Sequence, residues 1–345
     1  MFEKFRNSQS DTYIIAEVGQ NHQGKLENAL EYIRVFKNCG VDAVKFQIRD
    51  NKYLFDDSAY NMRYNSDNAF AENYGPHRER LELSKTEMSE CKNLCDELEI
   101  DFIATPFDEP SLEFLISLSP KAIKIASFDL GNLPFISLIA KSNLPIILSI
   151  GGGKDKHINE TIKLIEELNN DLAILHCVSK YPCPENELNL SNIQNLLSEF
   201  PKHTIGSSDH FNGISSGVIA YMLGARVFEK HVTLNRAWKG TDHSFALEPE
   251  GMRKFVRDIK RVSQMLDLNI DEDIGNEPVF KKLGKSLVAK KNINIGSRIN
   301  LEDLSGRIFL EQGVPVREAY FFLGKKAIKD IKKGDKISYQ HFKKE

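Results

Sequence analysis

The 345-residue sequence lacks long apolar runs and has only five cysteines, and these two shortages exclude several classes of protein. No apolar stretch approaches the roughly 18 residues that a membrane-spanning helix needs, so we predict no membrane association. Residues 1–12 are polar and charged, without the apolar segment of a secretion signal. The cysteines are odd in number and lack metal-type spacing, and we interpret them as reduced thiols of a cytoplasmic protein.

The net charge of −3 is small, but it is unevenly divided along the chain. Residues 281–345 contain 16 Lys or Arg against 7 Asp or Glu, a net charge of +9, which leaves −12 for the preceding residues. A basic segment is as consistent with a solvated surface as with binding of an anionic substrate. Because no RNA- or DNA-binding motif accompanies it, we predict no nucleic-acid partner.

A domain boundary is visible at residues 267–278, which are acidic, short of large side chains, and contain the Gly and Pro typical of linkers. The length of the chain suits two domains. We predict a first domain over 1–266, a linker over 267–284 and a small second domain over 285–345.

Eight short β-branched and apolar segments recur in the first 235 residues, separated by amphipathic stretches long enough for helices such as 26–39 and 158–168. Alternation of strands and helices predicts a parallel sheet, and eight units is the number that closes a (β/α)8 TIM barrel. Residues 50–84 are too long for an ordinary connection and predict a lid or binding loop. The predicted strands cover 13–19, 43–49, 101–107, 122–127, 145–151, 173–179, 204–210 and 227–233.

Each of these segments finishes in polar or charged side chains, and in a barrel such ends converge on one mouth. A polar residue after one strand is usually a turn residue, but eight such ends together predict a binding site. The residues concerned are Glu17, Lys45, Gln47, Thr105, Lys124, Ser127, Ser149, Ser179, Ser208, His210 and His231.

Lys45 and Lys124 each lie within an apolar strand, where an ammonium group needs a partner. An anion is the partner that we favour, because the neighbouring hydroxyl groups add donors for a phosphate and a carboxylate. The alternative is pairing with an internal carboxylate such as Glu17, which also has a general acid–base interpretation.

His210 and His231 end the seventh and eighth predicted strands, which are neighbours in a closed barrel, so their imidazoles could share one metal ion. Two histidines need further ligands, such as water, substrate oxygens or the Asp209 carboxylate. Imidazole with oxygen suits Mn²⁺ or a similar ion such as Co²⁺ better than Mg²⁺ alone. A single histidine at a strand end is more often structural.

Several motifs in one order resemble the sialic acid synthase family, and they cover nearly the whole chain. Those of the barrel are Ile14–Gly24, Asp42–Gln47, Ala104–Asp108, Ile123–Ser127, Ser207–His210, Phe228–Thr233 and Lys239–Pro249. Residues 285–291, 323–327 and 331–335 resemble the antifreeze-like (SAF) domain at the C-terminus of that family.

This resemblance implies condensation of phosphoenolpyruvate (PEP) with an N-acetylmannosamine-type aldose and release of inorganic phosphate. It also implies a domain-swapped homodimer in which the SAF domain covers the partner's barrel mouth. Glu17, His210 and His231 would be catalytic, and both histidines would bind the divalent cation. PEP would contact Lys45, Thr105, Lys124, Ser127, Ser149, Ser179 and Ser208, and the sugar would face Gln47, Asp129, Tyr181 and Asp242.

Some positions depart from the family pattern and leave the sugar substrate open. Phe128 stands before Asp129 where the family often has Gly, and Ser179 stands where many bacterial members have Asn. Residues 19–24, 74–75 and 238–240 resemble the animal-type enzyme, which uses a 6-phosphorylated sugar. The substrate could be N-acetylmannosamine, its 6-phosphate, or a diamino sugar leading to legionaminic or pseudaminic acid.

Two other classes of protein are less consistent with these residues. A non-catalytic sugar- or ice-binding protein would not need two strand lysines beside two strand-end histidines. A 3-deoxy-octulosonate-type synthase would lack the SAF-like C-terminal residues.

Overall fold

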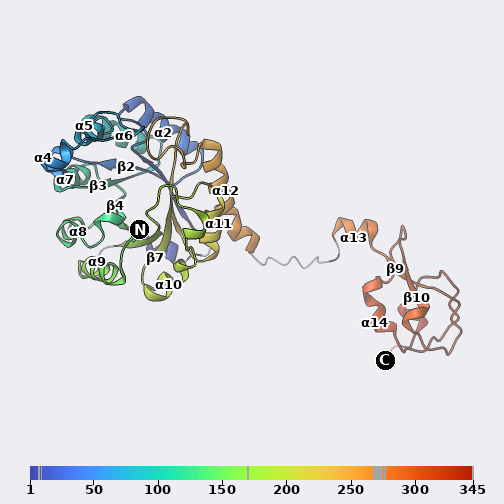
Figure 1. The fold of residues 1–345 in the computed structure, drawn as a ribbon. Helices are drawn as coiled ribbons and strands as arrows, with labels where there is room; N and C mark the ends of the chain where they lie inside the picture. The colour runs from blue at the N-terminus through green and yellow to red at the C-terminus, as the bar shows by residue number, and fades with distance from the viewer. Residues whose placement is uncertain (7, 9, 169–170, 267–274, 276, 344–345) are drawn as a thin grey trace. The chain divides into compact units, whose positions relative to one another are not determined.

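Eight parallel strands close into a barrel in the computed structural model, which describes residues 1–6, 8, 10–168, 171–266, 275 and 277–343 (Figure 1). Each strand pairs with the next along the chain, and β1 also pairs with β8, which confirms the predicted TIM barrel. The predicted strands run up to two residues past the observed ends. The strands are β1 Tyr13–Gly19, β2 Ala43–Ile48, β3 Asp101–Pro106, β4 Ala122–Ile125, β5 Ile146–Ser149, β6 Leu172–Cys177, β7 Thr204–Asp209 and β8 Val227–His231.

Helices between the strands surround the barrel (Figure 1). In α2 the buried residues Ala29, Tyr32, Ile33 and Phe36 follow helical spacing, so a single face of the helix packs on the sheet. The helices of this part are α1 Glu3–Arg6, α2 Leu26–Asn38, α3 Asn51–Leu54, α4 Asp57–Tyr60, α5 Tyr74–Glu79, α6 Lys85–Glu97, α7 Glu109–Ser117, α8 Leu133–Ala140, α9 Asp155–Glu167, α10 Asn192–Glu199, α11 Ser215–Met222 and α12 Pro249–Leu266.

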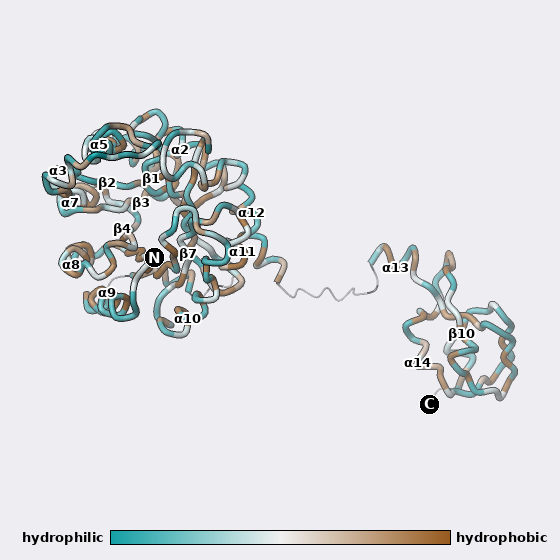
Figure 2. Tube along the Cα trace, viewed as in Figure 1, coloured by the Kyte–Doolittle hydropathy of each residue, from teal (hydrophilic) through white to brown (hydrophobic). Residues whose placement is uncertain are grey.

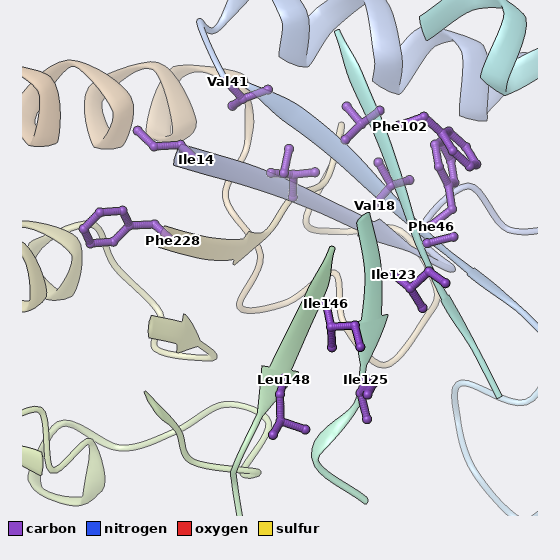
Figure 3. Packing of buried hydrophobic residues seen from close by; sticks show 14 of the residues in the cluster. Ile14, Val18, Val41, Phe46, Phe102, Ile123, Ile125, Ile146, Leu148 and Phe228 are labelled. Carbon is purple, nitrogen blue, oxygen red and sulfur yellow. The ribbon is translucent and has the colours of Figure 1, made fainter. Parts of the chain in front are cut away.

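The main hydrophobic core lies between the strands and this layer of helices. Successive strand residues point to opposite faces, so Ile14 and Val18 of β1 and Phe46 of β2 project outward into the core shown in Figure 3. The helices carry both hydrophobic and hydrophilic residues along their length (Figure 2), as expected of elements with one buried face.

A second apolar cluster fills the inside of the barrel on the side where the strands begin. Phe2 and Phe5, at the N-terminus and in α1, are buried in it. Its strand residues alternate with those of the outer core: Tyr13, Ile15, Ala43, Ile103, Ala122, Ile147, Ala173, Leu175 and Val227. We call this cluster the lower layer.

The long connection between β2 and β3 forms short helices held together by aromatic rings. Tyr74 contacts Phe55 and Tyr64 edge to face, with ring centroids 5.4 and 5.1 Å apart, and His77 packs on Tyr64 at 4.6 Å. The segment predicted as a lid or binding loop is therefore a packed substructure with its own small core.

The chain divides into a barrel unit, Met1–Asp267, and a C-terminal unit, Leu268–Glu345. Of the predicted linker 267–284, residues 267–274 and 276 lie outside the described residues, and Pro278–Leu283 form helix α13. The C-terminal unit pairs β9 Ser286–Ala289 with β10 Leu304–Arg307 antiparallel and includes α14 Ala319–Phe322. Its core includes Ile299, Phe322 and Ile337. Among the described residues, no helix is both long and apolar enough to cross a membrane.

Candidate active site

A cavity of about 970 Å³ opens where the barrel strands end, and residues at the ends of all eight strands line it. Because strand side chains alternate, the residue two positions beyond each lower-layer residue also points inward. Ile15 is thus followed by Glu17, and Ile147 by Ser149. All the predicted site residues except Asp129 line this cavity.

The ammonium group of Lys45 is buried and paired with carboxylates. Lys45 Nζ lies 2.8 Å from Glu17 Oε2 and 3.7 Å from Glu229 Oε1, and it donates to Thr105 Oγ1 at 3.1 Å. Burial lowers the pKa of Lys45, but the two carboxylates outweigh it and raise the pKa overall. Lys45 therefore pairs internally with Glu17, which was the alternative to an external anion.

Lys124 is less closely compensated than Lys45. Its Nζ donates to the Ile125 carbonyl at 2.9 Å and lies 3.9 Å from Glu229 Oε2. Burial lowers the pKa of Lys124, and the neighbouring charge of Lys45 lowers it further. Lys124 is the cation of this cluster with more capacity to bind an external anion.

Glu229 of β8 is a buried cavity residue that the sequence interpretation missed. Ser208 Oγ donates to Glu229 Oε1 at 3.1 Å. Burial raises the pKa of this carboxyl, but Lys124 and Lys45 outweigh burial and lower it, so Glu229 is ionised. The strand alternation could have found it, because Glu229 lies between Val227 and His231, which also face inward.

Hydroxyl groups also line the cavity. Ser127 Oγ and Ser179 Oγ are 2.8 Å apart, whereas Ser149 Oγ is buried and has no hydrogen-bond partner among the described residues. A Cβ on Gly151 would lie 2.5 Å from Ser179 Oγ, so glycine keeps this space open. Cys177 also lines the cavity and was not predicted; burial raises the pKa of its thiol to about 11.

His210 and His231 meet at the mouth, with ring centroids 5.2 Å apart. His210 Nδ1 donates to the Val178 carbonyl at 2.8 Å, so Nε2 is the ring nitrogen left for another ligand. Burial lowers the pKa of His210 to about 4. His231 Nδ1 is buried without a hydrogen-bond partner in the described part of the chain and lies 3.7 Å from Asp242 Oδ2. An imidazole nitrogen that has no hydrogen-bond partner is a suitable donor for a divalent transition metal.

These two imidazoles do not form a complete metal site by themselves. The described residues contain no group of three or more His, Cys, Asp or Glu arranged to hold a metal ion. Asp209, suggested as a third ligand, points away from the cavity: its Oδ2 pairs with Lys230 Nζ at 2.8 Å, and its Oδ1 accepts from Phe211 N. Water or substrate oxygens would have to supply the remaining ligands.

The residues predicted to face the sugar lie further out. Gln47 Nε2 donates to Glu17 Oε1 at 2.7 Å, and Tyr181 packs on His210 with ring centroids 3.9 Å apart. Asp129 does not line the cavity: it accepts from Asn132 Nδ2 at 3.1 Å. Phe128 and Asp129 lie on a short 3-10 turn at 127–129. Phe128 lines the cavity instead of Asp129 and stacks on Phe107.

Several further polar residues line the cavity and were not predicted, among them Gln20, Arg49, Asn68 and Arg78. Gln20 and Arg49 follow β1 and β2, whereas Asn68 and Arg78 belong to the 50–84 segment. Their positions depend on how that segment packs, so strand-end reasoning could not find Asn68 or Arg78.

Comparison with known proteins gives consistent results. Residues 32–270 match the model of the NeuB family. N-acetylneuraminate-9-phosphate synthase of Homo sapiens is 34% identical over 330 residues, which cover 95% of this chain and 92% of the relative. N,N'-diacetyllegionaminic acid synthase of Legionella pneumophila is 32% identical, with 98% of this chain and 96% of that relative covered.

A solved structure supports the same relationship. The N-acetylneuraminic acid synthetase from Leptospira borgpetersenii, in complex with citrate, superposes with a TM-score of 0.68 at 31% identity. The match covers 80% of this chain and 93% of that one.

Proposed function

The chain belongs to the NeuB family, and we propose that it is a sialic-acid-type synthase that condenses PEP with an N-acetylmannosamine-type aldose and releases inorganic phosphate. One observation carries this proposal: a single cavity joins two buried lysines and their carboxylates to two adjacent imidazoles. A binding protein has no use for such a costly set of buried charges.

In the proposed complex, Lys124 and the hydroxyls of Ser127, Ser149 and Ser179 bind the phosphate and carboxylate of PEP. Ser149 Oγ suits this role because it is buried without a partner among the described residues, and a PEP oxygen would satisfy it. Lys45 holds the Glu17 carboxylate in place, because the two groups are 2.8 Å apart. Cations beside the leaving phosphate stabilise the charge that develops on it.

His210 and His231 would hold a divalent cation, for which Mn²⁺ fits the donors best, and a bound cation would polarise the aldehyde oxygen of the open-chain sugar. PEP C3 then forms the new bond to the aldehyde carbon, the C=O π electrons pass to the aldehyde oxygen, which takes up a proton and becomes a hydroxyl, and positive charge develops at C2. Water adds at C2, and Glu17 accepts its proton. The tetrahedral intermediate loses phosphate by cleavage of the C2–O bond.

Two measurements test this function. Phosphate release should require both PEP and an aldose, and a panel of N-acetylmannosamine, its 6-phosphate and diamino sugars identifies the aldose. With ¹⁸O at the oxygen that bridges C2 and phosphorus, the label should leave with the phosphate. Label retained in the organic product would show attack at phosphorus and overturn the mechanism.

The resemblance also suggests a cytoplasmic, domain-swapped homodimer whose basic SAF-like unit covers the partner's anion-binding barrel. Such a cover would exclude bulk water, so that only the water that adds at C2 reaches the site. Light scattering tests the dimer. A barrel unit ending at Leu266 should lose most sugar-dependent phosphate release, and full activity of this truncated chain as a monomer would overturn the role of the C-terminal unit.

A further inference from the structure

Two arginines at the outer end of the cavity have no part in the chemistry described so far. Arg49 follows β2 directly, and Arg78 lies on α5 in the 50–84 segment, so distant parts of the chain bring them to one place. Both line the same cavity as Lys45 and Lys124.

The guanidinium of Arg49 is held firmly. It lies over the Phe107 ring, 3.6 Å from the centroid, and donates to Gln47 Oε1 at 2.7 Å. Its side chain is 8% exposed. A buried, stacked and hydrogen-bonded guanidinium presents its remaining donors in a fixed direction.

Positive charge is in excess around this pair. Arg49 lies 3.3 Å from Glu82 Oε1, but that oxygen also accepts from Gln20 Nε2 at 2.6 Å. Arg78 Nε is buried and has no hydrogen-bond partner within the described residues. Burial and the nearby charge of Arg78 lower the pKa of Arg49 to about 10. Among the described residues, Arg49 has Glu82 as its ion-pair partner and Arg78 has none, so positive charge exceeds negative charge here.

The order of residues along β2 shows which end of a substrate would reach these arginines. Lys45, Gln47 and Arg49 all line the cavity at alternate positions, and four residues of extended chain span at most about 13 Å. In the proposed complex, the aldehyde carbon of the aldose meets PEP near Lys124. The opposite end of the sugar then points outward, toward Arg49.

We propose that Arg49 and Arg78 form a second anion subsite that binds a phosphate monoester at the end of the aldose remote from its aldehyde. This inference rests on the proposed function and specifies its substrate class: a sugar phosphate. A phosphate offers several acceptor oxygens to two planar guanidiniums, which is the geometry in which arginine binds best. A neutral sugar would leave the positive charge of the two guanidiniums without an anionic partner.

Arg78→Met tests the subsite without disturbing Arg49 or its contact with Gln47. Sugar-dependent phosphate release would be measured with N-acetylmannosamine and with its 6-phosphate. In the unaltered protein we expect the phosphorylated sugar to have the higher kcat/KM. Arg78→Met removes a charged hydrogen-bond donor that only the phosphorylated sugar would use. It should therefore lower the ratio of kcat/KM for the 6-phosphate to kcat/KM for N-acetylmannosamine by about 10- to 100-fold.

Arg63→Met is the matched control. Arg63 lies in the same 50–84 segment and carries the same charge, but it is exposed, pairs with Glu72 at the surface and does not line the cavity. This variant should leave the ratio unchanged. Arg78→Lys should lie between Arg78→Met and the unaltered protein, because it keeps the charge and loses the planar fork.

Direct calorimetric titration of N-acetylmannosamine 6-phosphate separates failure of this proposal from failure of the proposed function. If no aldose supports phosphate release from PEP, the proposed function is wrong, and the titration still decides whether Arg78 binds the sugar phosphate. Equal losses with both sugars, a rise confined to the KM for PEP, or unchanged titration of Arg78→Met would overturn the subsite.

Discussion

Ile147 and Ser149 lie two residues apart on β5 and point into the same barrel, yet their surroundings are opposite in character. Ile147 belongs to the apolar lower layer, whereas Ser149 belongs to an upper layer of polar and charged groups. The same change occurs on β1, from Ile15 to Glu17, and on β8, from Val227 to Glu229. The backbone is continuous through both layers, so side-chain chemistry alone separates them.

The lower layer supports the fold, and the upper layer supports the chemistry. Apolar burial in the lower layer stabilises the barrel directly. In the upper layer, the ion pairs of Lys45 with Glu17 and Glu229 mainly offset the free-energy cost of burying these charges. Substitutions in the two layers should therefore have separable effects on stability and activity.

The largest effect should come from the metal-binding pair of the upper layer. His231→Ala or His210→Ala should lower kcat by about 10³-fold or more, with an unchanged fold, because the polarising group is lost. Phosphate release and circular dichroism measure the two properties.

His203→Ala is the control, because His203 contacts Glu166 away from the cavity. Full activity of both cavity variants in thoroughly chelated buffer would contradict the metal role and remove this distinction between the layers.

Much of the barrel could be predicted from the sequence because its signals are local. The spacing of apolar segments indicated every strand, and the polar residue at each strand end indicated the cavity. Glu229 lies two residues before the end of β8, so only the alternation within the strand indicates that it faces the cavity. The pairing of Lys45 with Glu17 depends on the register of β1 against β2, which only the folded barrel defines.

The residues outside the strands were the least predictable. Asp129 and Asp209 have the right chemistry, but a short turn and the outward strand face direct them away from the cavity. Arg78 depends on the packing of the 50–84 segment, which its aromatic residues determine.

In the lower layer, Ile147→Ala should lower the free energy of unfolding of the barrel unit by about 2–5 kcal/mol, because it leaves a cavity in a closely packed interior. The KM for PEP should not change. Urea unfolding followed by the fluorescence of Trp238, the only tryptophan, reports on this unit. A large rise in KM with unchanged stability would show that the two layers are not separable in this way.

In the upper layer, Lys124→Met should raise the KM for PEP by about 10- to 100-fold, because a charge-assisted contact to an anion is lost. The KM for the sugar should change less. Lys121→Met, at an exposed position just before the same strand, is the matched control. Unchanged PEP kinetics would remove Lys124 from the PEP site and leave it as a partner of Glu229 alone.

The smallest effect should come from Ser149→Ala, which makes the sharpest comparison with Ile147→Ala on the same strand. Ser149 Oγ is buried without a partner among the described residues, so its removal should leave stability unchanged or raise it by about 1 kcal/mol. In the complex the same hydroxyl would donate to PEP, and its loss should raise the KM for PEP by about 2- to 10-fold. Ile147→Ala would then lower stability alone, and Ser149→Ala would raise the KM for PEP without loss of stability. A destabilised Ser149→Ala protein with normal PEP kinetics would instead assign Ser149 to the lower, structural layer.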